Sequence, residues 1–221
     1  MPMTTPGSRD RVRAEERRRR WIFAAVGVGV IAIAVVIGVL SAAETGSALS
    51  VADVAGDPTI EGEALSTAPE DPGADPEAGS PSPVVGGTDF DGREVTIGEP
   101  GGAQLVMFMA SWCPACQEEL PEVVDWIDAG GLPEGVDVVS VATLHDDTRP
   151  NWPPQEWFER EGFEGPVLVD DAGSSVAEAF GLRATPYWVA IDADGQVAAR
   201  VTGMLGAEQL DALAAQVQDG A

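Results

Sequence analysis

The sequence predicts an α/β domain with a mixed central sheet flanked by helices, extending over residues 83–221. Apolar runs at 104–110 and 136–143 have the length and composition of buried central strands. A helical segment at 113–129 lies between them, which favours a parallel βαβ unit. Two further runs, 187–192 and 196–201, flank an Asp-Gly pair and predict an antiparallel hairpin at the end of the domain. Parallel and antiparallel pairs together imply a mixed sheet.

The other elements follow from turn residues and periodicity. Pro121 lies inside the helix at 113–129, and Gly130-Gly131 end that helix. Gly181 ends the helix predicted at 174–180. The remaining elements, in chain order, are an extra N-terminal β-hairpin (84–89 and 93–97), a short helix (154–161), a short strand (166–170), a helix (174–180) and an amphipathic C-terminal helix (207–217).

The N-terminal part has a different composition. Residues 1–20 hold seven of the twelve arginines, and residues 21–40 contain no charged residue. A helix of twenty apolar residues spans about 30 Å, the thickness of a bilayer core. We therefore expect a transmembrane helix at 21–43 with the basic residues 1–20 in the cytoplasm and the remainder exported to the far side of the cell membrane. A cleaved signal peptide is the alternative, since Ser41-Ala42-Ala43 resembles a cleavage site, but the apolar segment is long for one.

Residues 44–82 contain nine acidic residues, no basic residue and many Pro, Gly, Ala and Ser. Such a composition buries little apolar surface, so we expect a disordered linker that tethers the folded domain. The whole chain has a net charge of −25. An acidic surface repels polyanions, which argues against nucleic acid as a partner.

The only two cysteines, Cys113 and Cys116, follow an apolar strand at the start of a helix. A helix N-terminus favours a thiolate, the nucleophile of disulfide exchange. Cys113 is then the attacking cysteine and Cys116 resolves the mixed disulfide, with no cofactor beyond this redox-active pair. Three alternatives compete. A zinc site needs about four ligands, and His145 is the only histidine; a structural disulfide would close a very small ring; inert buried thiols are disfavoured in an exported protein.

The string at 109–116 (MASWCPAC) resembles thioredoxin-fold proteins, and more narrowly the membrane-anchored TlpA-like thiol–disulfide oxidoreductases, some of which serve cytochrome c maturation. The resemblance covers residues 82–221 and includes Pro121 and the Thr185-Pro186 pair. It implies a thioredoxin fold, a cis peptide bond before Pro186 beside the cysteines, and a Thr185 backbone that binds an extended substrate. Trp112 and Pro114 would shape the same site. An ordinary turn is the alternative for Thr185-Pro186.

One position departs from the thioredoxin pattern. Classical thioredoxins have a buried acid six residues before the first cysteine, where this chain has Met107. The proton acceptor for Cys116 is therefore unassigned. Glu118 and Glu119 are near in sequence, but we expect both on a solvated helix face, and we expect His145 to be a loop residue.

The resemblance implies an enzyme that reduces or exchanges disulfides of exported proteins and takes electrons from a membrane thiol-transfer protein. Cytochrome c maturation is one process such an enzyme would serve. A redox-inactive thioredoxin-like binding module of a membrane complex is the alternative. A peroxidase is disfavoured, since peroxiredoxins have Thr three residues before the reactive cysteine and this chain has Ala110.

Overall fold

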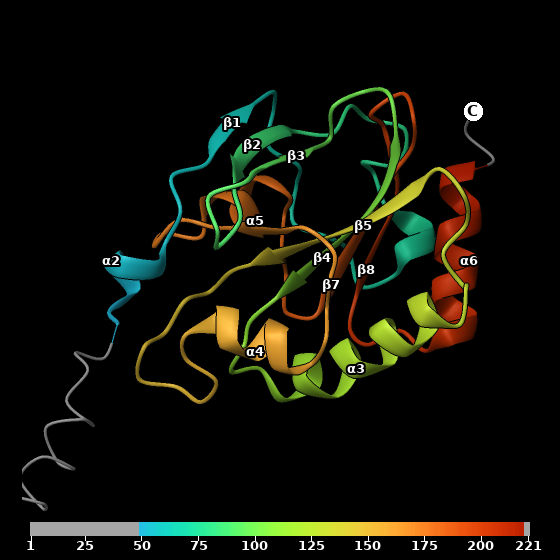
Figure 1. Cartoon of the computed structure of the whole chain (residues 1–221). Coiled ribbons are helices and arrows are strands. Elements are labelled where there is room, and N and C mark those ends of the chain that lie inside the picture. Colours follow the sequence, from blue (N-terminus) through green and yellow to red (C-terminus); the bar gives the residue numbers. More distant parts are fainter. Residues whose placement is uncertain (1–48, 219–221) are drawn as a thin grey trace, which may run out of the picture. The chain divides into compact units, whose positions relative to one another are not determined.

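The computed structural model describes residues 49–218 (Figure 1). The basic segment 1–20, the expected transmembrane helix 21–43 and the first part of the expected linker lie outside these residues. Within residues 49–218, no helix is both long enough and apolar enough to cross a bilayer.

A five-stranded mixed sheet forms the centre of the domain, with strand order β6-β5-β4-β7-β8. Strand β4 (Ala103–Met109) pairs in parallel with β5 (Val136–Ala142), and β5 pairs in parallel with β6 (Val167–Val169). Strand β7 (Tyr187–Ile191) runs antiparallel to β4, and β8 (Val197–Thr202) antiparallel to β7. The predicted mixed sheet and terminal hairpin are confirmed.

Each face of this sheet carries its own hydrophobic core, because successive side chains of a strand point to opposite faces. Leu105, Met107 and Met109 of β4 belong to the cluster covered by α3 (Pro114–Asp128) and α6 (Ala207–Gln218). Val106 and Phe108 belong to the cluster on the opposite face. In Figure 1, α3 and α6 lie along one side of the sheet, and α5 (Ser175–Ala179) and the N-terminal strands lie on the other.

The extra N-terminal hairpin is also present. Strands β2 (Val84–Thr88) and β3 (Glu94–Ile97) pair antiparallel across the turn that contains Gly92. A strand not expected from the sequence, β1 (Thr59–Glu61), adds to β2 and makes a separate three-stranded sheet. The short helix α4 (Pro154–Arg160) occupies its predicted position between β5 and β6.

The expected disorder of the linker is wrong for residues 49–82. This segment, called the strap below, contains α2 (Val51–Val54), β1 and a 3-10 turn, η1 (Pro72–Ala74). Leu65 and Ala68 of the strap are buried, and their amides donate to the carbonyl oxygens of Ala179 and Gly181. The strap packs closely, since a Cβ at Gly181 would lie 2.1 Å from the Ser66 oxygen.

A buried ion pair fixes the strap to the sheet. Arg200 of β8 donates to both carboxylate oxygens of Asp75, at 2.8 and 2.6 Å, and to the carbonyl oxygen of Ser66 at 2.6 Å. The two charged side chains are 0% and 1% exposed. Burial raises the pKa of Asp75, but the hydrogen bonds and charge of Arg200 outweigh burial and leave that pKa below its ordinary value. A few specific contacts therefore order a segment whose composition is typical of disorder.

Candidate functional site

The two cysteines lie at the N-terminus of α3, directly after the end of the central strand β4. Cys113 is the N-cap residue, with extended backbone angles (φ −75°, ψ 121°), and Pro114 takes the first helical position. The Cys113 amide donates to the Ala110 carbonyl at 2.9 Å, which closes the turn between strand and helix. Both cysteines are free thiols, 7% and 0% exposed respectively. Cys113 is thus the outer thiol and Cys116 the inner one.

The two thiols differ in acidity. Burial raises the pKa of Cys113, but hydrogen bonds with the side chain of Thr185, with the amide and thiol of Cys116 and with the Ala115 amide leave it below the ordinary thiol value. Burial raises the pKa of Cys116 strongly, and the neighbouring Cys113 raises it further. The helix N-terminus favours negative charge on the outer sulfur. The site therefore favours a thiolate on Cys113 and a protonated thiol on Cys116.

The Thr185-Pro186 pair lies next to the outer thiol. The peptide bond between them is cis, so the conformation predicted for Pro186 is confirmed. The Cys113 thiol donates to the Thr185 carbonyl at 3.5 Å. Pro186 is buried, and its carbonyl accepts from the Gly203 amide at 2.9 Å. The chain thus brings Thr185 to Cys113 from 72 residues away.

Trp112 is half-buried against the segment that follows β5. Its indole N–H donates to the Leu144 carbonyl at 2.7 Å, and the guanidinium of Arg149 lies 4.6 Å from its ring centroid. The Ser111 carbonyl accepts from the side-chain amide of Asn151 at 3.1 Å. Residues 144–153, called the active-site loop below, therefore fix the residues before Cys113. Pro114, by contrast, is exposed at the helix tip.

Glu119 corrects the prediction of a solvated helix face. Glu118 is exposed as expected, but Glu119 is 0% exposed. Its Oε1 accepts from the Trp188 indole at 3.0 Å and from the Leu205 amide at 2.6 Å, whereas its Oε2 is buried without a hydrogen-bond partner in residues 49–218. Burial raises the pKa of Glu119 to about 7, although the bonds from Leu205 and Trp188 oppose the shift.

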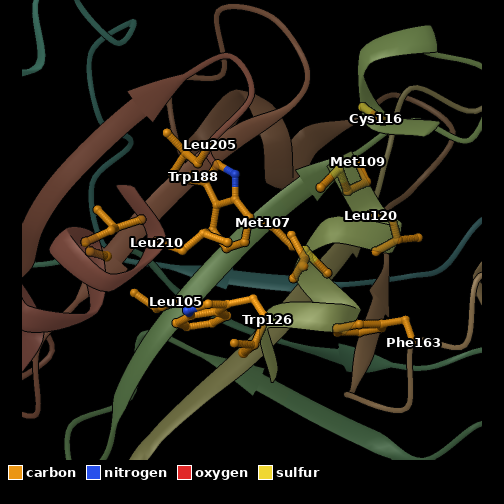
Figure 2. Close-up of a cluster of buried hydrophobic side chains, with 14 of the residues drawn as sticks. Leu105, Met107, Met109, Cys116, Leu120, Trp126, Phe163, Trp188, Leu205 and Leu210 are labelled. Atoms are coloured by element: carbon orange, nitrogen blue, oxygen red, sulfur yellow. The ribbon is translucent and has the colours of Figure 1, made fainter. Parts of the chain in front are cut away.

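The buried acid of this domain therefore comes from the helix and not from the strand. Met107 is buried as a core residue, and its partner across β4 and β7 is Trp188, the residue that donates to Glu119. Figure 2 shows Cys116 and Met109 at one end of this core and Trp188 and Leu205 farther along it. Glu119 lies three residues after Cys116, which on a helix places the two on one face.

His145 lies in the active-site loop, as expected. Its Nε2 is 3.1 Å from the Asp170 carbonyl oxygen, and its ring makes a T-shaped contact with Trp152, with 6.0 Å between centroids. Burial lowers its pKa. These contacts tie the loop to β6 and do not bring His145 to the cysteines.

Comparisons with known proteins show which proteins the chain is similar to. A family model described as Redoxin matches residues 77–214. The methylamine utilization protein MauD of Methylobacillus flagellatus is 31% identical over 128 residues, which are 57% of this chain and 57% of that protein. The thiol-disulfide oxidoreductase ResA of Halalkalibacterium halodurans is 25% identical over 116 residues, 52% of this chain and 62% of that protein. The chain thus spans less than two thirds of the length of these two relatives.

Solved structures show the same fold. A thiol:disulfide interchange protein of the thioredoxin family from Chlorobium tepidum TLS has a TM-score of 0.51 at 23% identity, covering 63% of this chain and 96% of that one. The thioredoxin fold and the TlpA-like resemblance are confirmed by these relatives. Because the Redoxin model matches well over half of its residues, the chain belongs to the Redoxin family.

Proposed function

We propose that this protein is a thiol–disulfide oxidoreductase whose redox centre is the pair Cys113 and Cys116. The observation that carries the proposal is the asymmetry of the two thiols at the start of α3. The outer thiol has a lowered pKa and the inner thiol a raised one. A thiolate attacks disulfides and a thiol does not, so the asymmetry supports Cys113 as the thiol that attacks first. The names of similar proteins, such as thiol-disulfide oxidoreductase ResA, support the same chemistry.

In the reductive direction, the Cys113 thiolate attacks one sulfur of a substrate disulfide. A bond forms between Cys113 and that sulfur, the substrate disulfide breaks, and the second substrate sulfur leaves as a thiolate that takes a proton from solvent. Cys116 then attacks the Cys113 sulfur, which releases the first substrate sulfur. The substrate gains two electrons, and the protein is left with a Cys113–Cys116 disulfide that a dithiol must reduce.

The second attack requires Cys116 to lose its proton inside the core. Glu119 is the candidate acceptor, because it lies one helical turn farther along the same face of α3 and has an unpartnered oxygen. Its pKa of about 7 allows it to take up and release a proton near neutral pH. Glu119 would thus have the function of the buried acid that thioredoxins have at the position of Met107.

The proposal includes a location and a direction. The basic and apolar N-terminal segments support a single-pass anchor, with residues 49–218 outside the cytoplasm. There the protein would reduce disulfides of exported proteins and be reduced in turn by a membrane thiol-transfer protein. Service in cytochrome c maturation belongs to the same proposal and rests on the TlpA-like resemblance. A measured reduction potential of about −120 mV, typical of strong oxidants, would contradict the reductive direction.

The test uses the reduced full-length chain and a peptide that contains one disulfide. The wild type should convert the peptide to its dithiol and itself to the Cys113–Cys116 disulfide, both visible by mass spectrometry. Cys116→Ser should stop at a mixed disulfide between Cys113 and the peptide. Cys113→Ser is the matched control and should form no mixed disulfide. A mixed disulfide formed by Cys113→Ser would refute Cys113 as the attacking thiol. If the wild type does not reduce the peptide and Cys113→Ser supports full function in cells, a redox-inactive binding module becomes the better account.

A further inference from the structure

We propose that Arg149 binds a substrate carboxylate, on a residue adjacent to the cysteine that Cys113 attacks. The inference rests on the proposed function and adds a substrate property to it. It starts from the position of Arg149 over the face of Trp112, the residue immediately before the attacking cysteine. The guanidinium carbon is 4.6 Å from the ring centroid, inside the range of a cation–π contact.

The active-site loop holds this arginine in place. The Trp112 indole N–H donates to the Leu144 carbonyl at 2.7 Å, so the ring under the Arg149 guanidinium does not rotate freely. The Arg149 amide donates to the Asp146 carbonyl at 3.2 Å, which closes a turn around the arginine. The other end of the loop is tied to the strap, where the Trp152 indole donates to the Leu49 carbonyl at 2.6 Å. A group fixed before binding loses less conformational entropy when a ligand arrives.

Arg149 also differs from the other arginines of residues 49–218. Arg200 is fully buried with Asp75. The other three form ion pairs that involve neither Trp112 nor the cysteines: Arg93 with Asp89 and Asp91, Arg160 with Glu161, and Arg183 with Glu70.

Arg149 remains available to a ligand. Its side chain is 53% exposed. Its single carboxylate partner in residues 49–218 is Asp146, which lies 3.4 Å away and is 37% exposed. An exposed pair of this kind contributes little, so an incoming carboxylate can share or replace Asp146. In a domain so rich in acidic residues, this position is where a negatively charged substrate segment meets a positive group beside the redox pair.

The substrate must pass this position. The Thr185 carbonyl lies against the Cys113 thiol, and Trp112 is the adjacent residue of the chain. A segment that brings its sulfur to Cys113 therefore has a neighbouring residue near Trp112 and Arg149. The hydrogen bonds that lower the pKa of Cys113 come from the Thr185 side chain, Cys116 and Ala115, and Arg149 is not among them.

The test compares two disulfide peptides that differ in one residue beside the cysteine, Asp in one and Lys in the other. The ratio of kcat/KM for the Asp peptide to that for the Lys peptide should fall about two- to fivefold in Arg149→Gln. This fall corresponds to the free energy that an exposed ion pair contributes. Arg149→Glu should lower the ratio further, and Arg149→Lys should retain part of it. Arg93→Gln, which removes a charge that is paired with Asp89 and not with Trp112, should keep the wild-type ratio. At about 1 M salt the difference between wild type and Arg149→Gln should shrink, because the Debye length is only about 3 Å.

The outcomes separate the two proposals. If the wild type exchanges neither peptide, the proposed function fails. If it exchanges both but Arg149→Gln keeps the wild-type ratio, the role of Arg149 is refuted and the proposed function stands. The midpoint of Cys113 alkylation with pH should be unchanged in Arg149→Gln; a rise would show that Arg149 acts on the thiol and would overturn the recognition role.

Discussion

The ion pair between Asp75 and Arg200 should carry a large share of the stability of the domain. Asp75→Ala removes both carboxylate oxygens that accept from Arg200 and leaves a guanidinium that is 0% exposed, with carbonyl oxygens as its remaining partners. Breaking a buried pair by removing one partner costs about 3–5 kcal/mol. The total free energy of unfolding of a domain is about 5–15 kcal/mol, so the loss is a large fraction.

Urea unfolding of the full chain measures this effect. With a slope of about 1–3 kcal/mol per molar urea, a loss of about 3–5 kcal/mol in Asp75→Ala should lower the midpoint by about 1–5 M. The matched control is Glu63→Ala, an exposed carboxylate of the same strap, which should change stability by less than about 0.5 kcal/mol. The double variant Asp75→Leu with Arg200→Met should recover much of the loss, because it removes the unpaired charge.

The same pair predicts a pH dependence. The pKa of Asp75 is lower in the folded state than in the unfolded chain, so its contribution is present above the ordinary carboxyl pKa and is lost as the pH falls through the folded value. The gap between wild type and Asp75→Ala should therefore close in acid. An unchanged urea midpoint at neutral pH, or amides of Leu65 and Ala68 that exchange with solvent as fast in the wild type as in Asp75→Ala, would refute the view that this pair fixes the strap.

Glu119 and Thr143 should also affect the stability of the domain measurably. Glu119 has a raised pKa of about 7 in the folded state, so its contribution to stability is present below about pH 4.5 and lost as the pH rises through 7. Between these pH values the free energy of unfolding of the wild type, measured from urea midpoints, should fall by about 3 kcal/mol or less. Glu119→Gln should remove this fall. An equal fall in both proteins would mean that the pKa of Glu119 is the same in the folded and unfolded states. Thr143→Val removes the hydroxyl that donates to buried Asp170 at 2.7 Å, and should cost about 1–3 kcal/mol in the same assay, whereas no loss would show that Asp170 is satisfied by its backbone donors alone.

The central sheet and the redox motif could be predicted because their signals are local. The apolar runs of β4 and β5 are buried strands by composition alone, and the position of Cys113 between strand and helix follows from the same pattern. The cis bond at Pro186 was implied by the TlpA-like resemblance, since nothing local to Thr185-Pro186 separates it from an ordinary turn.

The strap could not be predicted in this way. Its composition favours disorder, and its order depends on a partner, Arg200, that lies 125 residues after Asp75. Glu119 was misplaced for a different reason. Its residue type suggested solvent, but helical spacing from Cys116 to Leu120 and Val123 puts position 119 on the buried face of α3. Periodicity outweighs residue type where a buried acid has hydrogen-bond donors.

The alkylation rates of the two thiols, followed with pH and resolved by mass spectrometry, test the central claim most directly. The reduced full-length chain is treated with iodoacetamide, and the label on each cysteine is measured over time. Cys113 should react first, with a midpoint below the ordinary thiol pKa of about 8.5, and Cys116 should stay largely unlabelled across the same range. Faster labelling of Cys116, or a Cys113 midpoint at or above the ordinary value, would contradict the assignment of Cys113 as the attacking thiol.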